Sequence, residues 1–268
     1  MKTIVLANQK GGVGRSAVAT LLAQYVVHRG QRVLAIDLDQ KGHLSGALRL
    51  SRRATVSAVT ADQLLSTPDV HIGAARFVLV PATETLMALE RFPHLHLAFR
   101  SNLHNFLCSV EAAFDLCIID SSSSPDVRQT LAISSADCVL VPVQLHGEAV
   151  ECVRATIASA TAGSAETPAY GRPSRRQVRL LPSLVTWTRL EALTFAELLG
   201  IYPELMLPLP GSRLGHACIA YHPAVATTCA DGHLLWEMRS QAARHAWKDV
   251  KPSLDAIVAR LGCGEARP

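Results

Sequence analysis

The sequence predicts an α/β fold, a doubly wound and mostly parallel sheet with helices on both faces, from three observations. Short apolar runs alternate with longer amphipathic segments along the chain, which is the pattern of repeated βα units. Glycine-rich or acidic stretches directly follow several apolar runs, as they do where a parallel sheet presents its binding edge. No long linker divides the 268 residues, of which 49% are hydrophobic, so we expect a single domain over residues 1–268.

Seven apolar runs are the expected strands, and helices are expected between most of them. These runs lie near Thr3, Val33, Phe77, Leu116, Val139, Leu180 and Leu205. Right-handed crossovers bring the carboxyl ends of parallel strands to one edge of the sheet, where ligands bind. A further helix is expected near Leu234 to Val250, with Trp236, Ala243 and Trp247 on its core-facing side.

The first apolar run, Ile4 to Ala7, leads directly into "QKGGVGRSA" (Gln9 to Ala17) and then into a helical segment. A strand, a glycine-rich turn and a helix N-terminus aim backbone N–H groups and a helix dipole at one point, which suits polyphosphate. The alternative is a tight strand-to-helix turn that binds nothing. The predicted phosphate-binding residues are Gly11, Gly12, Val13, Gly14, Arg15, Ser16 and Ala17.

Arg15 stands where the ordinary phosphate-binding loop has a lysine that reaches the β and γ phosphates. The next residue, Ser16, is at the position that holds Mg²⁺. A guanidinium is a planar fork, whereas an ammonium is a compact charge on a flexible stem, so the exchange is not conservative at a tight site. Nucleotide binding is expected, and the rate of hydrolysis is the open question.

Two later apolar runs end in carboxylates. The segment "RVLAIDLDQKG" ends a buried-strand pattern with Asp37 and Asp39, and "FDLCIIDSSSSPD" delivers Asp120 at the end of the next such strand. Mg²⁺ suits this edge because it binds few protein carboxylates, keeps several waters and bridges substrate phosphates. Taken singly, each aspartate fits a helix cap or a surface turn equally well.

Together with Lys10, these segments resemble the deviant Walker A ATPases of the ParA/MinD family, whose loop reads KGGxGK[ST]. The resemblance implies that Lys10 reaches across a dimer interface to the partner's nucleotide and that Asp39 positions or activates the attacking water. It also implies that Ser16 and Asp120 support Mg²⁺, Asp120 usually through water, and that Asp37 does so indirectly. The implied cofactors are ATP and Mg²⁺.

The resemblance continues beyond the first half of the chain, with departures at two loops. The run "SADCVLVPVQ" is similar to the family's AADxVIIPVQ strand, and "LLPSLVTWTR" and "LMLPLPGSRLGHACIAYHPAV" resemble the segments that enclose the adenine. Gln40 and Lys41 replace the family's Pro-Gln after the second carboxylate, and four serines precede Pro125 where the family has x-Pro-Pro. The candidates for the adenine side are Pro210, Gly211, Ser212 and Arg213.

A basic stretch suggests a partner. The chain carries a net charge of +4, and the segment between Thr167 and Leu190 holds five arginines and no acid. Such a run is often only a solvated face. The alternative is a patch for the phosphate backbone of nonspecific double-stranded DNA, doubled by dimer symmetry. The arginines are Arg172, Arg175, Arg176, Arg179 and Arg189, with Arg244, Lys248 and Lys251 as a possible extension on one helix face.

Three functions stay open. The first is that of a short ParA-type protein, cytoplasmic and nucleoid-associated: an ATPase that forms a homodimer when ATP-bound, binds DNA nonspecifically and responds to a ParB-like stimulating partner in segregation or cargo positioning. The second is a nucleotide-dependent scaffold or switch with slow hydrolysis because of Arg15, such as a conjugation accessory protein of the VirC1 type. The third, a MinD-like membrane cycle, is disfavoured because "SLDAIVARLGCGEARP" offers few bulky apolar residues.

Overall fold

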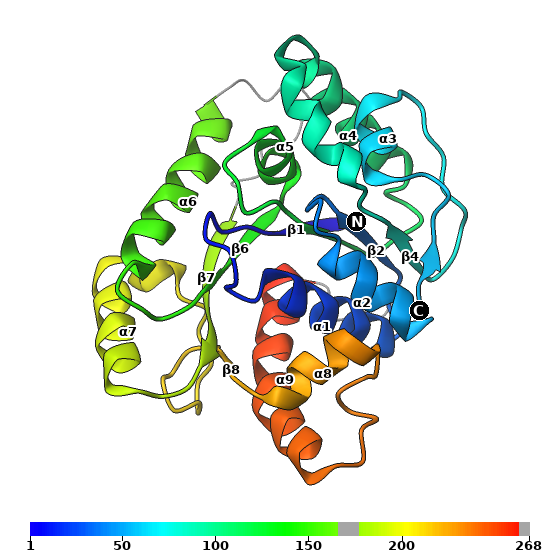
Figure 1. Cartoon of the computed structure of the whole chain (residues 1–268). Helices are drawn as coiled ribbons and strands as arrows, with labels where there is room; N and C mark the ends of the chain where they lie inside the picture. Colours follow the sequence, from blue (N-terminus) through cyan, green and yellow to red (C-terminus); the bar gives the residue numbers. More distant parts are fainter. Residues whose placement is uncertain (166–176, 263–268) are drawn as a thin grey trace.

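The computed structural model describes residues 1–165 and 177–262, in which eight parallel strands form one sheet (Figure 1). The order across the sheet is β3-β4-β2-β5-β1-β6-β7-β8. The predicted doubly wound α/β fold is therefore confirmed. The strands are β1 (Lys2–Leu6), β2 (Val33–Asp37), β3 (Thr55–Val56), β4 (Phe77–Val80), β5 (Leu116–Asp120), β6 (Cys138–Val143), β7 (Gln177–Val185) and β8 (Ile219–Ala220).

Helices cover both faces of the sheet (Figure 1). Alternate residues of each central strand face opposite layers. On β1, Val5 packs into one apolar cluster and Ile4 and Leu6 into the other. One layer holds α1 (Arg15–His28), α2 (His43–Ser51), α8 (Pro223–Asp231) and α9 (Gln241–Leu261). The other holds α3 (Ala61–Ser66), α4 (His96–Ser109), α5 (Val127–Ser135), α6 (Ala149–Ala165) and α7 (Arg189–Ile201).

The strand order reverses at β1, and the register aligns the strand ends there. From β1 the chain builds outward first through β2 and β4 and later through β6, β7 and β8. Leu6 of β1 pairs with Asp120 of β5, and Asp120 pairs with Asp37 of β2. The loop after β1 and the two carboxylates therefore share one edge, at the switch point where open α/β sheets bind ligands.

Two expectations about the second half of the chain were wrong. The run near Leu205 forms a 3₁₀ turn, η3 (Pro203–Leu205), and Met206 makes only an isolated bridge to Leu180. Prolines on both sides of this run lack the N–H that a strand interior needs, and the sheet instead gains β8. The last helix begins at Gln241 and not near Leu234, because Ser240 caps it by accepting a hydrogen bond from the Ala243 amide.

The C-terminal helix α9 uses its apolar face inside the protein. Val250, Leu254 and Ile257 are buried in the cluster that also contains α1. Tyr25 of α1 packs edge-on against Trp247, with ring centroids 5.5 Å apart, and its hydroxyl bonds Asp255. Among the described residues, no helix combines the length and apolarity needed to cross a bilayer.

Candidate functional site

The loop after β1 is shaped as a phosphate cradle. Gly12 and Gly14 have φ of 79° and 84°, a left-handed conformation that glycine adopts without strain. The Asn8 side chain donates to the Pro142 carbonyl of β6 (2.8 Å) and accepts from the Lys10 amide (2.8 Å), which fixes the start of the loop. No side chain among the described residues caps the N-terminus of α1, so its first amides are free to bind an anion.

Asp120 has the features of a carboxylate that binds a cation. It is fully buried at the end of β5, and neither of its oxygens has a hydrogen-bond partner among the described residues. Burial, and then the nearby Asp37, raise the pKa of Asp120 to about 8, while the Ser16 hydroxyl and Arg15 act in the opposite direction. A buried carboxylate without hydrogen bonds costs free energy unless it is neutralised or paired, so Asp120 and Ser16 fit a Mg²⁺ site.

Both carboxylate oxygens of Asp37 accept hydrogen bonds from nearby residues. Its Oδ2 accepts from both the amide and the hydroxyl of Ser45, each at 2.7 Å, and its Oδ1 accepts from the Asp39 amide at 3.1 Å. Burial raises the pKa of Asp37 to about 6, against the lowering effect of the Ser45 bonds. Asp37 therefore shapes the loop that carries Asp39 and adds negative charge beside Asp120.

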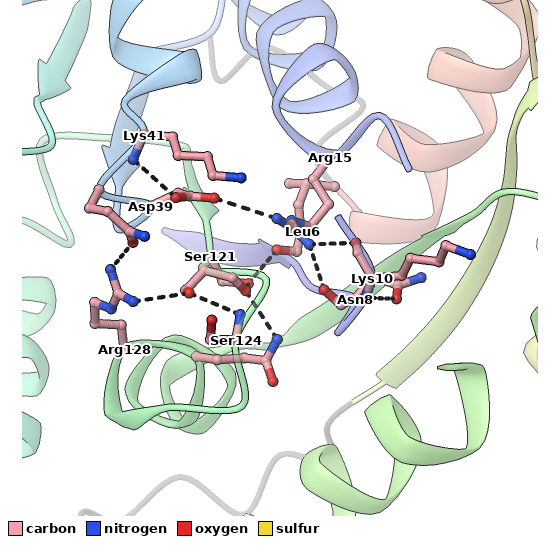
Figure 2. Close-up of polar contacts among 12 residues, drawn as sticks. Leu6, Asn8, Lys10, Arg15, Asp39, Lys41, Ser121, Ser124 and Arg128 are labelled. Atoms are coloured by element: carbon pink, nitrogen blue, oxygen red, sulfur yellow. Dashed lines mark hydrogen bonds and ion pairs between the residues drawn. The ribbon is translucent and has the colours of Figure 1, made fainter. Parts of the chain in front are cut away.

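Arg15 closes the site from the other side (Figure 2). The guanidinium donates to the backbone carbonyls of Asn8 and Lys10 and lies 3.5 Å from Oδ2 of Asp39. Both ends of this ion pair are buried, with side-chain exposures of 7% and 5%. Arg15 is thus folded into the loop, and Asp39 is held by it and by the Lys41 amide.

Lys10 is held within its own subunit. Its ammonium lies 2.8 Å from the Glu148 carboxylate, which is just before α6. The ion pair lowers the pKa of Glu148, and the exposures of the two side chains, 31% and 73%, place it at the surface. A surface pair of this kind is weak, so Lys10 can exchange this partner for another.

The end of β7 lies against the glycine loop. The Ser183 hydroxyl donates to the Val13 carbonyl at 2.6 Å. Leu184, which lies against Gly14, and Trp187 both have positive φ, 56° and 68°. Such conformations in non-glycine residues cluster at ligand sites. Arg213, one of the predicted adenine-side residues, stacks on the Trp187 ring at 4.9 Å, while Pro210 is exposed in the same loop.

Two of the five predicted DNA-binding arginines, Arg179 and Arg189, lie in the described residues. Arg172, Arg175 and Arg176 lie outside them. Arg179, near the start of β7, is half-buried and donates to the Glu204 carbonyl, whereas Arg189 begins α7 beyond the strand's other end.

Three side chains at this edge escaped the sequence analysis. Glu148 and Trp187 carry no spacing signal, because each is recognised only from its partner. Arg128 of α5 bonds Gln40 in the loop after β2, and no sequence pattern predicts this contact either. An ion pair, a stacked ring or a side-chain hydrogen bond joins residues far apart in the chain, and no local pattern encodes it.

Comparison with known proteins identifies relatives along almost the whole chain. The family model described as AAA domain (AAA_31) matches residues 1–162. Protein IncC of Escherichia coli is 31% identical over 97% of this chain and 70% of its own length. The chromosome-partitioning ATPase Soj of Thermus thermophilus is 32% identical over 59% of this chain and 61% of its own length.

Solved structures share the fold. An ATP complex of a McdA variant from Cyanothece superposes with a TM-score of 0.78 at 18% identity, covering 100% of this chain and 99% of that one. Cobyrinic acid a,c-diamide synthase from Mycobacterium smegmatis, with bound ADP and magnesium, gives 0.70 at 21% identity, covering 100% and 98%. At these identities the similarity shows the fold.

Proposed function

This chain belongs to the family of ParA-type partition ATPases, and from that premise we propose that it is an Mg·ATP-dependent ATPase that dimerises, binds DNA nonspecifically and takes part in segregation or cargo positioning. The observation that carries the proposal is the meeting of the glycine loop, Asp39 and the unpartnered Asp120 at one edge of the sheet. The names of the relatives, IncC and Soj, support the biological setting.

In this proposal the nucleotide is held by backbone and side chains together. The amides of Gly11 to Ser16 and the N-terminus of α1 bind its phosphates. Ser16 and Asp120 hold Mg²⁺, and Asp37 contributes negative charge without ligating. When bound, the metal neutralises charge that develops on the transferred phosphoryl group. The stacked Trp187 and Arg213 border the base, with Pro210 in the same loop.

Asp39 orients the attacking water and accepts its proton. For that, its carboxylate must be released from Arg15, because the oxygen that now faces the guanidinium is the one that must face the water. Arg15 must likewise leave the carbonyls of Asn8 and Lys10 before it can contact phosphate oxygens. The arrival of a polyphosphate offers the guanidinium a stronger partner, so nucleotide binding and the release of Asp39 are coupled.

Lys10 makes the second half of the site in the dimer. The proposal requires its ammonium to leave Glu148 and reach the nucleotide of the facing subunit. The weakness of an exposed ion pair makes this exchange inexpensive. DNA, a ParB-like stimulating partner and a nucleoid-associated cytoplasmic location complete the proposal, with the arginines of residues 172–189 as the first DNA candidates.

The proposal is tested by nucleotide titration, steady-state hydrolysis and mass determination on three proteins. We expect the wild type to bind ATP, hydrolyse it and dimerise with Mg·ATP. Asp39→Ala should bind ATP and dimerise without turnover, and Lys10→Ala should bind ATP as a monomer. Failure of the wild type to bind ATP would refute the proposed function, and hydrolysis that survives Asp39→Ala would refute the role given to Asp39.

The second candidate, a nucleotide-dependent switch with little turnover, is favoured by one observation. Arg15 is held by two carbonyls and by Asp39, so the cation that the family places on the phosphates is engaged inside the loop. If hydrolysis is undetectable while ATP still drives dimerisation, the switch is the better description.

A further inference from the structure

A second buried arginine, Arg128, joins two loops of the site. It lies in the first turn of α5, with 6% of its side chain exposed. Its guanidinium donates to the carboxylate of Asp126, to the Ser122 hydroxyl at 3.2 Å and to the side-chain carbonyl of Gln40. Ser122 and Asp126 belong to the loop after β5, whereas Gln40 belongs to the loop after β2.

The stability of α5 does not explain this arginine. Asp126 caps the helix on its own, because its other oxygen accepts from the Gln129 amide. A cation in the first turn opposes the helix dipole and is unfavourable there. Burying a guanidinium is also costly unless each side of the fork finds an acceptor. Of the contacts that offset these costs, the one to Gln40 reaches a different loop, whereas those to Ser122 and Asp126 stay in the loop that leads into α5.

Gln40 is next to Asp39 in the chain, and this makes the contact relevant to chemistry. The same turn is closed by the Lys41 and Gly42 amides, which both donate to Asp39. Figure 2 shows the contact from Arg15 to Asp39 in this turn. Arg128 bonds the next residue of the same turn, Gln40. Arg15 belongs to the phosphate loop and will respond to nucleotide, whereas Arg128 belongs to the loop that follows Asp120.

We propose that Arg128 is a positioning residue that ties Gln40, and with it Asp39, to the loop after β5 and so sets the rate of ATP hydrolysis without binding nucleotide. The inference rests on the proposed function. It predicts that the position of Asp39 is maintained when the Arg15–Asp39 contact breaks, because the neighbouring Gln40 stays bonded to Arg128. Gln40 stands where the family has proline, and its side-chain oxygen accepts the hydrogen bond from Arg128.

The test combines kinetics with amide hydrogen exchange in Arg128→Gln, Gln40→Ala and the double variant. Each single variant should lower kcat for ATP roughly tenfold, the scale of one lost charge-assisted hydrogen bond, with the ATP dissociation constant changed less than twofold. The double variant should lose no more than the worse single variant, because both remove the same link. Arg154→Gln, which removes an exposed arginine of α6, should leave kcat unchanged.

Exchange separates this inference from the proposed function. In the nucleotide-free protein, the amides of Lys41 and Gly42 should exchange faster in Arg128→Gln and in Gln40→Ala, whether or not the wild type hydrolyses ATP. Gln40→Ala changes a half-exposed side chain and keeps the test available if Arg128→Gln does not fold. Additive losses in the double variant, unchanged exchange at these amides, or a loss confined to ATP affinity would overturn the inference. A wild type without turnover would refute the proposed function and with it the effect on rate, and the exchange at Lys41 and Gly42 would still decide whether Arg128 anchors this turn.

Discussion

Replacing Asp120 by asparagine is expected to stabilise the nucleotide-free protein while removing its Mg²⁺-dependent function. The carboxylate is fully buried, and burial and the nearby Asp37 raise its pKa from 3.8 to about 8, which the Ser16 hydroxyl and Arg15 only partly offset. Because the folded pKa lies above the unfolded one, the folded state binds the proton more tightly. The penalty for ionising Asp120 is absent below about pH 4, grows through the interval up to about pH 8 and is complete above it.

The size of the effect follows from the same interval. Four pH units correspond to roughly 5 kcal/mol as an upper limit, and Asp37, with a pKa of about 6, shares the titration. We therefore expect Asp120→Asn to raise the free energy of unfolding at pH 8 by about 2 kcal/mol and to flatten its decline between pH 5 and pH 8. Urea unfolding of both proteins across this range measures the difference.

Two comparisons make the prediction sharp. Mg²⁺ with nucleotide should stabilise the wild type and leave the variant nearly unaffected, because binding to the folded state shifts the unfolding equilibrium by mass action. Asp62→Asn serves as the opposite control: burial alone would raise the pKa of Asp62, but the hydroxyls of Thr83, Thr60 and Thr85 outweigh it and lower the pKa, so its stabilising effect is lost as the pH falls. If Asp120→Asn destabilised the protein at pH 8, the reasoning about this carboxylate would be refuted.

Three further predictions follow from single contacts. Arg15→Lys should raise the ATPase rate about tenfold, because an ammonium cannot hold two carbonyls and Asp39 as the guanidinium does; an unchanged rate would show that Arg15 is not the brake. Glu148→Gln should strengthen ATP-dependent dimerisation by up to about fivefold, the scale of a surface ion pair, since it frees Lys10; sedimentation velocity would show this, and weaker dimerisation would contradict it. Gly232→Ala should destabilise the protein by about 2 kcal/mol or more, because φ is 73° and the new Cβ would lie 2.4 Å from backbone atoms. Gly200→Ala, in open space on α7, should instead stabilise it by up to about 1 kcal/mol. Equal midpoints of the two variants in thermal unfolding would refute this reasoning.

The sequence was sufficient for the parts of the fold that local patterns encode. Glycine or aspartate at the end of an apolar run indicates the binding edge of the sheet, because the carboxyl ends of parallel strands meet there. This logic located β1, β2 and β5 and the residues that follow them. It failed near Leu205, where an apolar run flanked by prolines looks like a strand and forms a 3₁₀ turn, and at β8, which is too short to have a period.

The electrostatic state of the site was beyond sequence reasoning. The pKa of Asp120 depends on how close the side chains of Ser16 and Arg15 come to its carboxylate. The family pattern predicts a role for this residue but does not predict its pKa. The Lys10–Glu148 and Arg128–Gln40 contacts join residues separated by 138 and 88 positions. Their meeting is decided by tertiary packing, to which a linear motif is blind.

Retention of nonspecific duplex DNA by the purified protein tests the account most directly. It should be measured at 50 and 200 mM salt, with Mg·ATP, with Mg·ADP and without nucleotide. We predict retention with Mg·ATP only, weakened roughly a hundredfold at the higher salt if the complex makes about four phosphate contacts in total. Retention that is equal in all three states, or absent although ATP binds, would contradict an ATP-controlled DNA-binding function.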